Sequence, residues 1–170
     1  LSTISSPPTT SQFAPPTRES VLAYVDIRHE LETLSGTING KFGELDWVPI
    51  QYIHRSTPRE LLVDVFRQSR IGVVTPLRDG MNLVAKEYVA AQDPEDPGVL
   101  VLSRFAGAAR QMREALLVNP NSPEEVADAL KRALAMGKPE RIQRWQALFE
   151  GVEREDVTAW RDAFVTALTR

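Results

Sequence analysis

Apolar and polar positions follow two different spacings along the chain, and the changes between them predict the elements. Short apolar runs occur at residues 47–53, 71–76, 98–103 and 115–120. The run at 98–103 shows no alternation, which is typical of a strand buried on both faces of a parallel sheet. The intervening segments carry apolar residues at helical spacing. We therefore expect an α/β fold with a doubly wound, mostly parallel sheet.

The helices that this spacing predicts alternate with the strands. The clearest start is at Ser122, which can cap a helix that has Pro123 at its first position and Glu125 at the capping-box position. Gly137 is expected to end that helix. The predicted helices span residues 20–39, 59–68, 82–92, 122–137, 139–149 and 156–168.

The composition changes near residue 18. Residues 1–17 are rich in Ser, Thr and Pro and offer little for a core to bury. Because burial there cannot offset the entropy of ordering, we expect this segment to be irregular or disordered. Residues 18–170 have a globular composition, and they are predicted to form one domain.

Charge and residue counts exclude several functional classes. The net charge is −3 and no block is rich in Lys or Arg, so a nucleic-acid partner is not expected. No apolar run is long enough to cross a membrane, and the first residues lack a secretory pattern. The absence of cysteine excludes thiolate metal sites and fits a cytoplasmic protein. His29 and His54 are too far apart for typical metal-ligand spacing, and both are expected to be structural or solvent-facing.

Charged and small residues gather where the run at 71–76 gives way to the next helix, at Asp79, Gly80 and Asn82. Ligands of parallel sheets bind beyond the carboxyl ends of strands. Gly80 allows a ligand to approach the backbone, and the unpaired amides of the helix start can receive phosphate or hydroxyl groups. Asp79 could accept hydrogen bonds from a polyol, and Glu87 from a ribose diol. These groups together suit a nucleotide-sugar.

Plainer explanations stay open for the same residues. Asp-Gly before a helix is common as a turn or a cap. The small residues at 105–109, Phe-Ala-Gly-Ala-Ala, could bring amides toward a ligand or could simply pack closely. A dinucleotide-binding domain is not indicated, because no G-x-G-x-x-G follows a strand.

These residues also carry a resemblance to a known family. TPLRDGMNLVAKEYVAAQDPEDPGVLVLSRFAGAA, residues 75–109, resembles the donor-site region of trehalose-6-phosphate synthases. The resemblance extends from about residue 12 to residue 170, through WVPIQYI, ALLVNPNSPEEVADALKRAL and the final Trp160-x-x-x-Phe164. It implies the Rossmann-like C-terminal domain of a GT-B glycosyltransferase. The implied reaction is retaining transfer of glucose from UDP-glucose to glucose 6-phosphate, which gives trehalose 6-phosphate.

The resemblance further implies roles for single residues. Asp79 would hold the hydroxyls of the donor glucose and is the expected catalytic residue, and Glu87 would take the ribose hydroxyls. Arg18 would reach the phosphate of glucose 6-phosphate, and Thr57 is the candidate for a contact to the base. The other donor-binding positions are Gly80, Met81, Asn82, Leu83, Val84, Ala85 and Lys86. No cofactor and no metal are expected; the sequence has no D-x-D motif, and fixed amides and cations would stabilise the leaving phosphate.

Members of that family are longer than these 170 residues. The resemblance implies an N-terminal acceptor domain as the missing partner, and an R-x-D-Y-x-K-G-like segment that supplies an Arg and a Lys to the donor diphosphate. Such charge-assisted bonds contribute roughly 1.5–3 kcal/mol each, so we expect this chain to bind UDP-glucose weakly and to turn over little. The alternative is a non-catalytic remnant or an interaction module. Whether the chain forms a homo-oligomer stays open.

Overall fold

The computed structural model describes residues 7–16 and 22–169, and the chain falls into two compact units. The first comprises residues 1–58 and the second residues 59–170. The composition alone predicted a single domain over residues 18–170. The boundary between the units instead falls after Pro58, directly before a helix.

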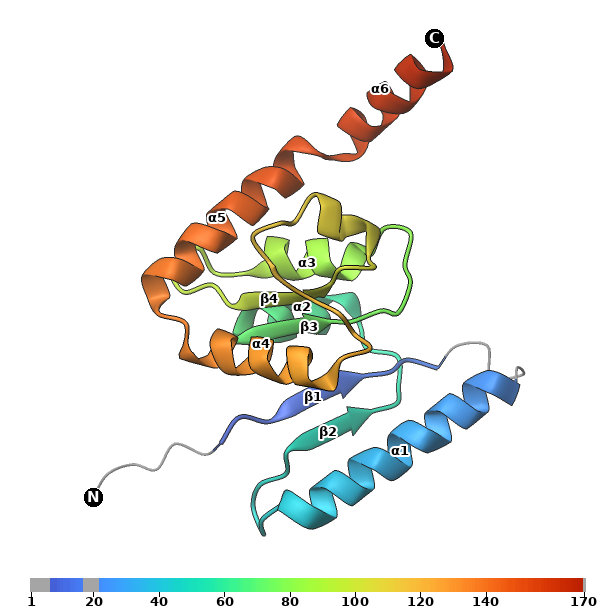
Figure 1. The fold of residues 1–170 in the computed structure, drawn as a ribbon, viewed down its shortest axis with the longest axis vertical. Coiled ribbons are helices and arrows are strands. Elements are labelled where there is room, and N and C mark those ends of the chain that lie inside the picture. Colours follow the sequence, from blue (N-terminus) through green and yellow to red (C-terminus); the bar gives the residue numbers. More distant parts are fainter. Residues whose placement is uncertain (1–6, 17–21, 170) are drawn as a thin grey trace. The chain divides into compact units, whose positions relative to one another are not determined.

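The first unit is a β–α–β arrangement formed by β1 (Thr10–Phe13), α1 (Leu22–Phe42) and β2 (Ile50–Ile53) (Figure 1). The two strands are parallel, with Thr10 opposite Ile50. The side chain of Asn39 joins α1 to β2, since it donates to the Ile50 carbonyl at 2.8 Å and accepts from the Ile50 amide at 3.0 Å.

The strand β1 corrects the expectation of an irregular segment at residues 1–17. That expectation is wrong at Thr10–Phe13, which pair along their length with β2. It rested on the few apolar side chains of the segment. Backbone N–H and C=O groups gain partners from a neighbouring strand whatever the side chains are. The Thr10 amide, for example, donates to the Pro49 carbonyl at 2.8 Å.

The second unit contains a parallel sheet of β3 (Ile71–Val74), β4 (Val99–Ser103) and β5 (Leu116–Val118), with β4 in the centre. Each strand and helix predicted for this unit is present, and the sequence pattern did not predict the short helix η1. The helices are α2 (Arg59–Gln68), α3 (Leu83–Ala91), η1 (Gly107–Arg110), α4 (Pro123–Ala135), α5 (Lys138–Arg154) and α6 (Val157–Leu168).

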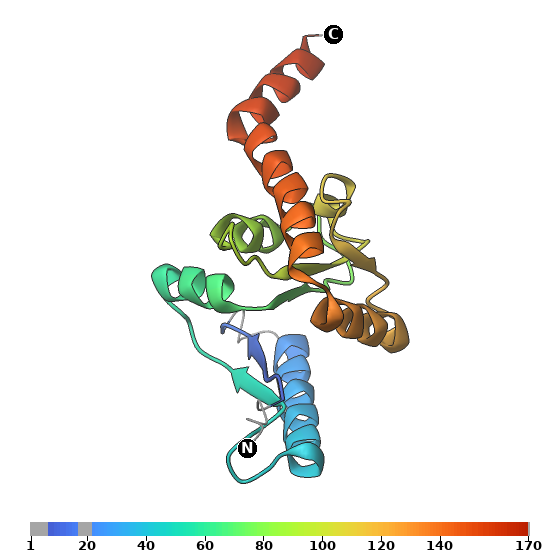
Figure 2. The same cartoon turned by 90° about the vertical axis from the view of Figure 1, so that its left-hand side faces the viewer.

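Helices cover both faces of this sheet. The side chains of β4 alternate between two cores: Leu100 and Leu102 pack with residues of α3 and α5, and Val99 and Val101 pack with residues of α4. Figure 2 shows α3 and α4 on opposite sides of the strands. This arrangement confirms the predicted doubly wound fold with a parallel sheet.

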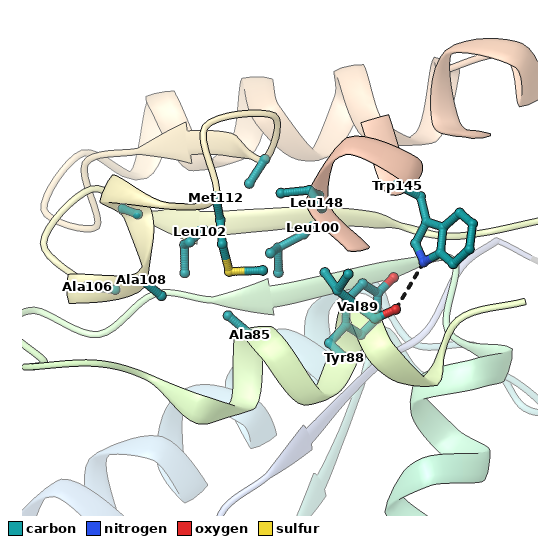
Figure 3. Close-up of a cluster of buried hydrophobic side chains, with 12 residues drawn as sticks. Ala85, Tyr88, Val89, Leu100, Leu102, Ala106, Ala108, Met112, Trp145 and Leu148 are labelled. Carbon is teal, nitrogen blue, oxygen red and sulfur yellow. Dashed lines mark hydrogen bonds between the residues drawn. The ribbon is translucent and has the colours of Figure 1, made fainter. Parts of the chain in front are cut away.

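The core between α3 and α5 fixes the position of α3 (Figure 3). Trp145 and Leu148 of α5 are buried in it. The Trp145 indole donates to the Val89 carbonyl at 3.0 Å, and the Tyr88 hydroxyl donates to the Ser69 carbonyl at 3.0 Å. These contacts hold α3 against the sheet, and its first turn borders the loop that precedes it.

Candidate functional site

The corner, residues 75–82, connects the carboxyl end of β3 to the amino end of α3. The adjoining loop, residues 105–109, follows the carboxyl end of β4. Since β3 and β4 are parallel neighbours, both segments begin at the same edge of the sheet. Backbone hydrogen bonds join them: the Asp79 amide donates to the Phe105 carbonyl (3.3 Å), the Gly107 amide to the Asp79 carbonyl (2.9 Å), and the Ala108 amide to the Met81 carbonyl (2.7 Å).

The small residues of the adjoining loop serve close packing. A β-carbon at Gly107 would lie 2.1 Å from the carbonyl oxygen of Gly80, far below van der Waals contact. The amides of the loop are occupied as well, by Asp79, Met81, Ser103 and Ala106. Of the two explanations that the sequence left open for this loop, the structure supports packing.

The Asp79 carboxylate is held by two hydrogen bonds from the corner itself. Its Oδ1 accepts from the Met81 amide at 3.0 Å, and its Oδ2 accepts from the Asn82 side-chain amide at 3.0 Å. The Met81 N–H, and after it the Asn82 amide, lower the pKa of Asp79 below its usual value. The side chain is half-buried and ionised at neutral pH, and each oxygen keeps a lone pair for a further donor.

Asn82 begins α3. Its Oδ1 accepts from the Ala85 amide at 2.9 Å, which is the bond of an N-cap. Its backbone is left-handed, with φ at 74°, and no other described residue, glycine included, has a positive φ. Asn is one of the residue types that tolerate this region. The turn-and-cap explanation of the corner is therefore correct for Asp79 and Asn82, but it leaves other groups of the corner unused.

Within the described part of the chain, the corner also has backbone amides without an acceptor and a stretch of backbone that no other protein group covers. Along the described ranges, no acceptor is found for the amides of Leu83 and Val84, which stand in the first turn of α3 at the positive end of its dipole. A β-carbon at Gly80 would meet nothing within 4 Å. Met81 is 47% exposed. The corner thus offers amide donors, an ionised acceptor and an accessible stretch of backbone side by side.

The later residues of α3 differ in what they present. Ala85 is fully buried and its amide donates to the Asn82 side chain, so neither its methyl group nor its N–H is available to a ligand. Lys86 is half-buried. Glu87 is exposed, and its Oε1 lies 3.8 Å from Nη2 of Arg59, an exposed pair of a kind that contributes little to stability.

Two predicted residues belong to the first unit. Thr57 is half-buried, and its Oγ1 has no hydrogen-bond partner among the described residues. Arg18 lies outside the described residues. His54, expected to be structural, has Nδ1 at 2.8 Å from the Ala14 carbonyl oxygen, and its ring stacks on Tyr52.

No group of three or more His, Asp or Glu side chains could hold a metal ion within residues 7–16 and 22–169. None of the helices described there combines the length and the apolar character needed to cross a bilayer.

Two features of the site have no counterpart in the sequence analysis. One is the backbone pairing of the corner with the adjoining loop, which leaves no trace in side-chain patterns. The other is the double use of the Asn82 side chain, which bonds both Asp79 and the start of α3. A signal for the second was present, because Asn directly before a helical pattern is a common N-cap.

Comparison with known proteins shows the family to which this chain is related. The profile of glycosyltransferase family 20 matches residues 9–170. Trehalose-6-phosphate synthase of Cronobacter sakazakii is 57% identical over 158 residues, which cover 93% of this chain and 33% of the relative. The trehalose-6-phosphate synthase of Klebsiella pneumoniae is 56% identical over the same length.

Solved structures agree with the sequence relatives. The crystal structure of an α,α-trehalose-phosphate synthase (UDP-forming) from Burkholderia xenovorans, in complex with glucose-6-phosphate, has a TM-score of 0.92 and 54% identity and covers 95% of this chain and 36% of that chain. A structure described as trehalose-6-phosphate from E. coli bound with UDP-2-fluoro glucose has a TM-score of 0.92 and 52% identity, with the same coverage.

The chain spans about a third of the length of the curated relatives it matches. The family match includes the corner and the adjoining loop. The resemblance to trehalose-6-phosphate synthases is confirmed, and with it the α/β fold of those proteins. The chain belongs to glycosyltransferase family 20.

Proposed function

We propose that this chain is the donor-binding part of a retaining glycosyltransferase that moves glucose from UDP-glucose to glucose 6-phosphate, giving trehalose 6-phosphate. Two relatives support the reaction: the Burkholderia xenovorans protein is a UDP-forming synthase in complex with glucose-6-phosphate, and the E. coli structure holds UDP-2-fluoro glucose. The observation that carries the proposal is the corner, where an ionised carboxylate stands beside free amides at the start of a helix.

Each group of the corner suits one part of UDP-glucose. Asp79 accepts hydrogen bonds from the glucose hydroxyls, and Gly80 lets the sugar lie against the backbone. The amides of Leu83 and Val84 face the diphosphate from the positive end of α3. Glu87, two turns along the same helix, accepts from the ribose diol. Thr57 and Arg18 are assigned to the base and to the acceptor phosphate by the family resemblance.

The state of Asp79 favours holding the sugar over proton transfer. Its lowered pKa makes it a weak base and keeps it ionised, and two hydrogen bonds fix its orientation. Negative charge instead develops on the leaving UDP, where amides fixed before the reaction stabilise it without rearranging. In the proposed reaction the acceptor attacks on the face that UDP leaves, and a phosphate oxygen of UDP takes the acceptor proton. Placement of the two substrates is then the task of the protein.

The 170-residue chain by itself is expected to bind UDP-glucose weakly and to form little trehalose 6-phosphate. The corner supplies amides and the carboxylate of Asp79, and Arg78 is its one cationic side chain. A diphosphate bound mainly by neutral donors lacks the charge-assisted bonds that contribute most. Abundant trehalose 6-phosphate from this chain alone would contradict the expectation.

Titration with UDP-glucose and with UDP tests the proposal. Asp79→Ala should weaken UDP-glucose roughly 10- to 100-fold, as expected for losing hydrogen bonds to a charged group, and should leave UDP unaffected. Glu87→Gln should weaken both ligands, because both contain the ribose. Asp128→Ala, an exposed carboxylate of α4 that pairs with Lys131, is the control and should change neither.

The outcome that removes Asp79 from the site is an unchanged affinity of Asp79→Ala for UDP-glucose. Equal losses for UDP and UDP-glucose would place its effect on the nucleotide or on the fold. Circular dichroism of each variant shows whether the fold is changed, and so separates an effect on the fold from an effect on nucleotide binding.

The competing function is that of a non-catalytic interaction module that keeps this fold. One observation favours it: Trp160 and Phe164 of α6 stack at 5.4 Å between ring centroids, yet are 58% and 51% exposed. Exposed aromatic pairs of this kind occur at protein interfaces. Specific binding of UDP-glucose at the corner distinguishes the donor-binding function from this one.

A further inference from the structure

We infer that Asn82 is a positioning residue: its side-chain amide orients the Asp79 carboxylate for the donor sugar and, with its other end, anchors that carboxylate to the start of α3. The role deepens the proposed function and rests on it where the sugar is concerned. The positioning of Asp79 itself rests on the geometry of the corner alone.

The orientation of the Asn82 amide is determined at both ends. Its Nδ2 donates to Asp79 Oδ2 at 3.0 Å, and its Oδ1 accepts from the Ala85 amide at 2.9 Å. The opposite orientation would set an oxygen against a carboxylate and an NH₂ group against an N–H, and both contacts are unfavourable. The side chain therefore has one arrangement that satisfies both neighbours.

The groups that surround Asn82 are themselves held by burial and hydrogen bonds. Ala85, which donates the cap bond, is fully buried, and α3 is held by the Trp145 bond to Val89. The corner in front is held by the adjoining loop, where the Ala108 amide donates to the Met81 carbonyl. Movement of the Asn82 side-chain amide would break its bond to Asp79 or its bond to the Ala85 amide.

The bond from Asn82 limits the orientations of the Asp79 carboxylate. Rotation about the last bond of an Asp side chain is soft, so a free carboxylate samples many orientations. Here Oδ1 is held by the Met81 amide and Oδ2 by Asn82, and the remaining lone pairs point away from both. A carboxylate fixed in advance loses less freedom when two sugar hydroxyls bind it, which favours affinity.

The left-handed backbone narrows the residue types that can fill this role. At φ 74°, Asn, Asp and Gly are tolerated, and most other residues are strained. Gly has no side chain for either bond. Asp can accept from the Ala85 amide but presents an oxygen to Asp79. Asn alone among the three provides the cap and the donor together.

Asn82→Asp therefore separates positioning from capping. It retains the cap acceptor and the tolerated backbone, and a carboxylate suits the positive end of a helix. It removes the donor to Asp79 Oδ2 and sets two carboxylates in contact. Because the new carboxylate keeps the Ala85 amide and the helix start, Asp79 is the one whose pKa should rise. The groups that contact Asp79 at present are uncharged: the Met81 N–H and the Asn82 side-chain amide at its carboxylate, and the backbone of Phe105 and Gly107 at its own backbone.

The experiment is an NMR titration of the Asp79 side-chain carboxyl carbon in the full 170-residue chain, together with thermal unfolding and UDP-glucose titration. Asn82→Asp should unfold within a few degrees of the parent, since its cap is kept. The apparent pKa of Asp79 should rise by about one unit or more. UDP-glucose affinity should fall about tenfold or more, and by more than UDP affinity, which the added charge beside the diphosphate also lowers. Asn121→Asp, the same change in the loop before α4, is the matched control and should alter none of these.

The two parts of the inference fail separately. An unchanged Asp79 titration in Asn82→Asp would overturn the positioning role, whatever the ligand does. A shifted titration with unchanged UDP-glucose affinity would show that Asn82 positions Asp79 but that the sugar does not use it, which contradicts the inference at the donor. If the parent chain binds no UDP-glucose at all, the proposed function fails, and a shifted titration still supports the positioning of the carboxylate.

Discussion

Gly80 and Gly107 face each other where the corner meets the adjoining loop, and they are glycine for different reasons. At Gly107 a β-carbon would lie 2.1 Å from the Gly80 carbonyl oxygen and 3.2 Å from the Met81 α-carbon, both of them backbone atoms that cannot move aside alone. At Gly80 a β-carbon would meet no protein atom within 4 Å. Gly107 is therefore required by the fold, whereas Gly80 leaves space beside the protein.

Alanine at each position should separate stability from binding. Gly107→Ala should lower the free energy of unfolding by about 1–3 kcal/mol, because the two loops must move apart, and should also weaken UDP-glucose. Gly80→Ala should keep stability within about 0.5 kcal/mol and still weaken UDP-glucose, because its methyl group occupies the path of the sugar. Urea denaturation and ligand titration measure the two effects.

Each variant serves as the control for the other. Wild-type affinity in Gly80→Ala would mean that no ligand approaches the backbone there. Wild-type stability in Gly107→Ala would mean that the corner and the adjoining loop separate easily, which the backbone bonds between them do not suggest.

At the scale of elements, Val73 of β3 and Val101 of β4 form a natural comparison. They are cross-strand partners in the parallel register. Val101 is fully buried, whereas Val73 is 44% exposed. The two positions share strand geometry and chemistry and differ in burial.

Replacing valine by alanine should therefore lower the free energy of unfolding more at Val101 of β4 than at Val73 of β3. Val101→Ala should lower the free energy of unfolding by roughly 2 kcal/mol, from lost burial and the cavity it leaves. Val73→Ala should cost less than about 1 kcal/mol, mostly from the weaker strand preference of alanine. Chemical denaturation of both variants checks the order, and equal costs would contradict the placement of β4 at the centre of the sheet.

The elements were predictable because apolar spacing follows burial, and their ends were less so. The helices that became α1 and α5 were predicted to end at residues 39 and 149, but they continue to Phe42 and Arg154. In α5, Phe149 and Val152 pack against the core, and this burial outweighs the cost of about 1 kcal/mol for Gly151 inside a helix. At β2, the strand begins only after Pro49, which has no N–H to contribute to pairing.

The candidate site, like the elements, was predictable only in part. The residue types of the corner were visible in the sequence, since Asp79, Gly80 and Asn82 stand where a strand changes to a helix. The bonds among them were not, because they depend on the left-handed turn of Asn82 and on backbone atoms of a loop some 25 residues further on. Side-chain patterns carry no record of such contacts.

For the whole molecule, the second unit contains the complete corner. Both strands that lead to it, the adjoining loop and the two cores beneath them are formed by residues of 59–170. The proposed contacts to glucose, diphosphate and ribose therefore lie within one compact unit. The proposed contacts of Thr57 and Arg18 come from residues 1–58.

The measurement that tests this account most directly is an NMR titration of the 170-residue chain with UDP-glucose, which detects even millimolar binding. The account predicts saturable shifts of the backbone amides from Asp79 to Val84 and of Glu87, with the Asp79 carboxyl signal responding to UDP-glucose and not to UDP. Saturable shifts elsewhere with those amides unmoved, or no shifts at all, would contradict it.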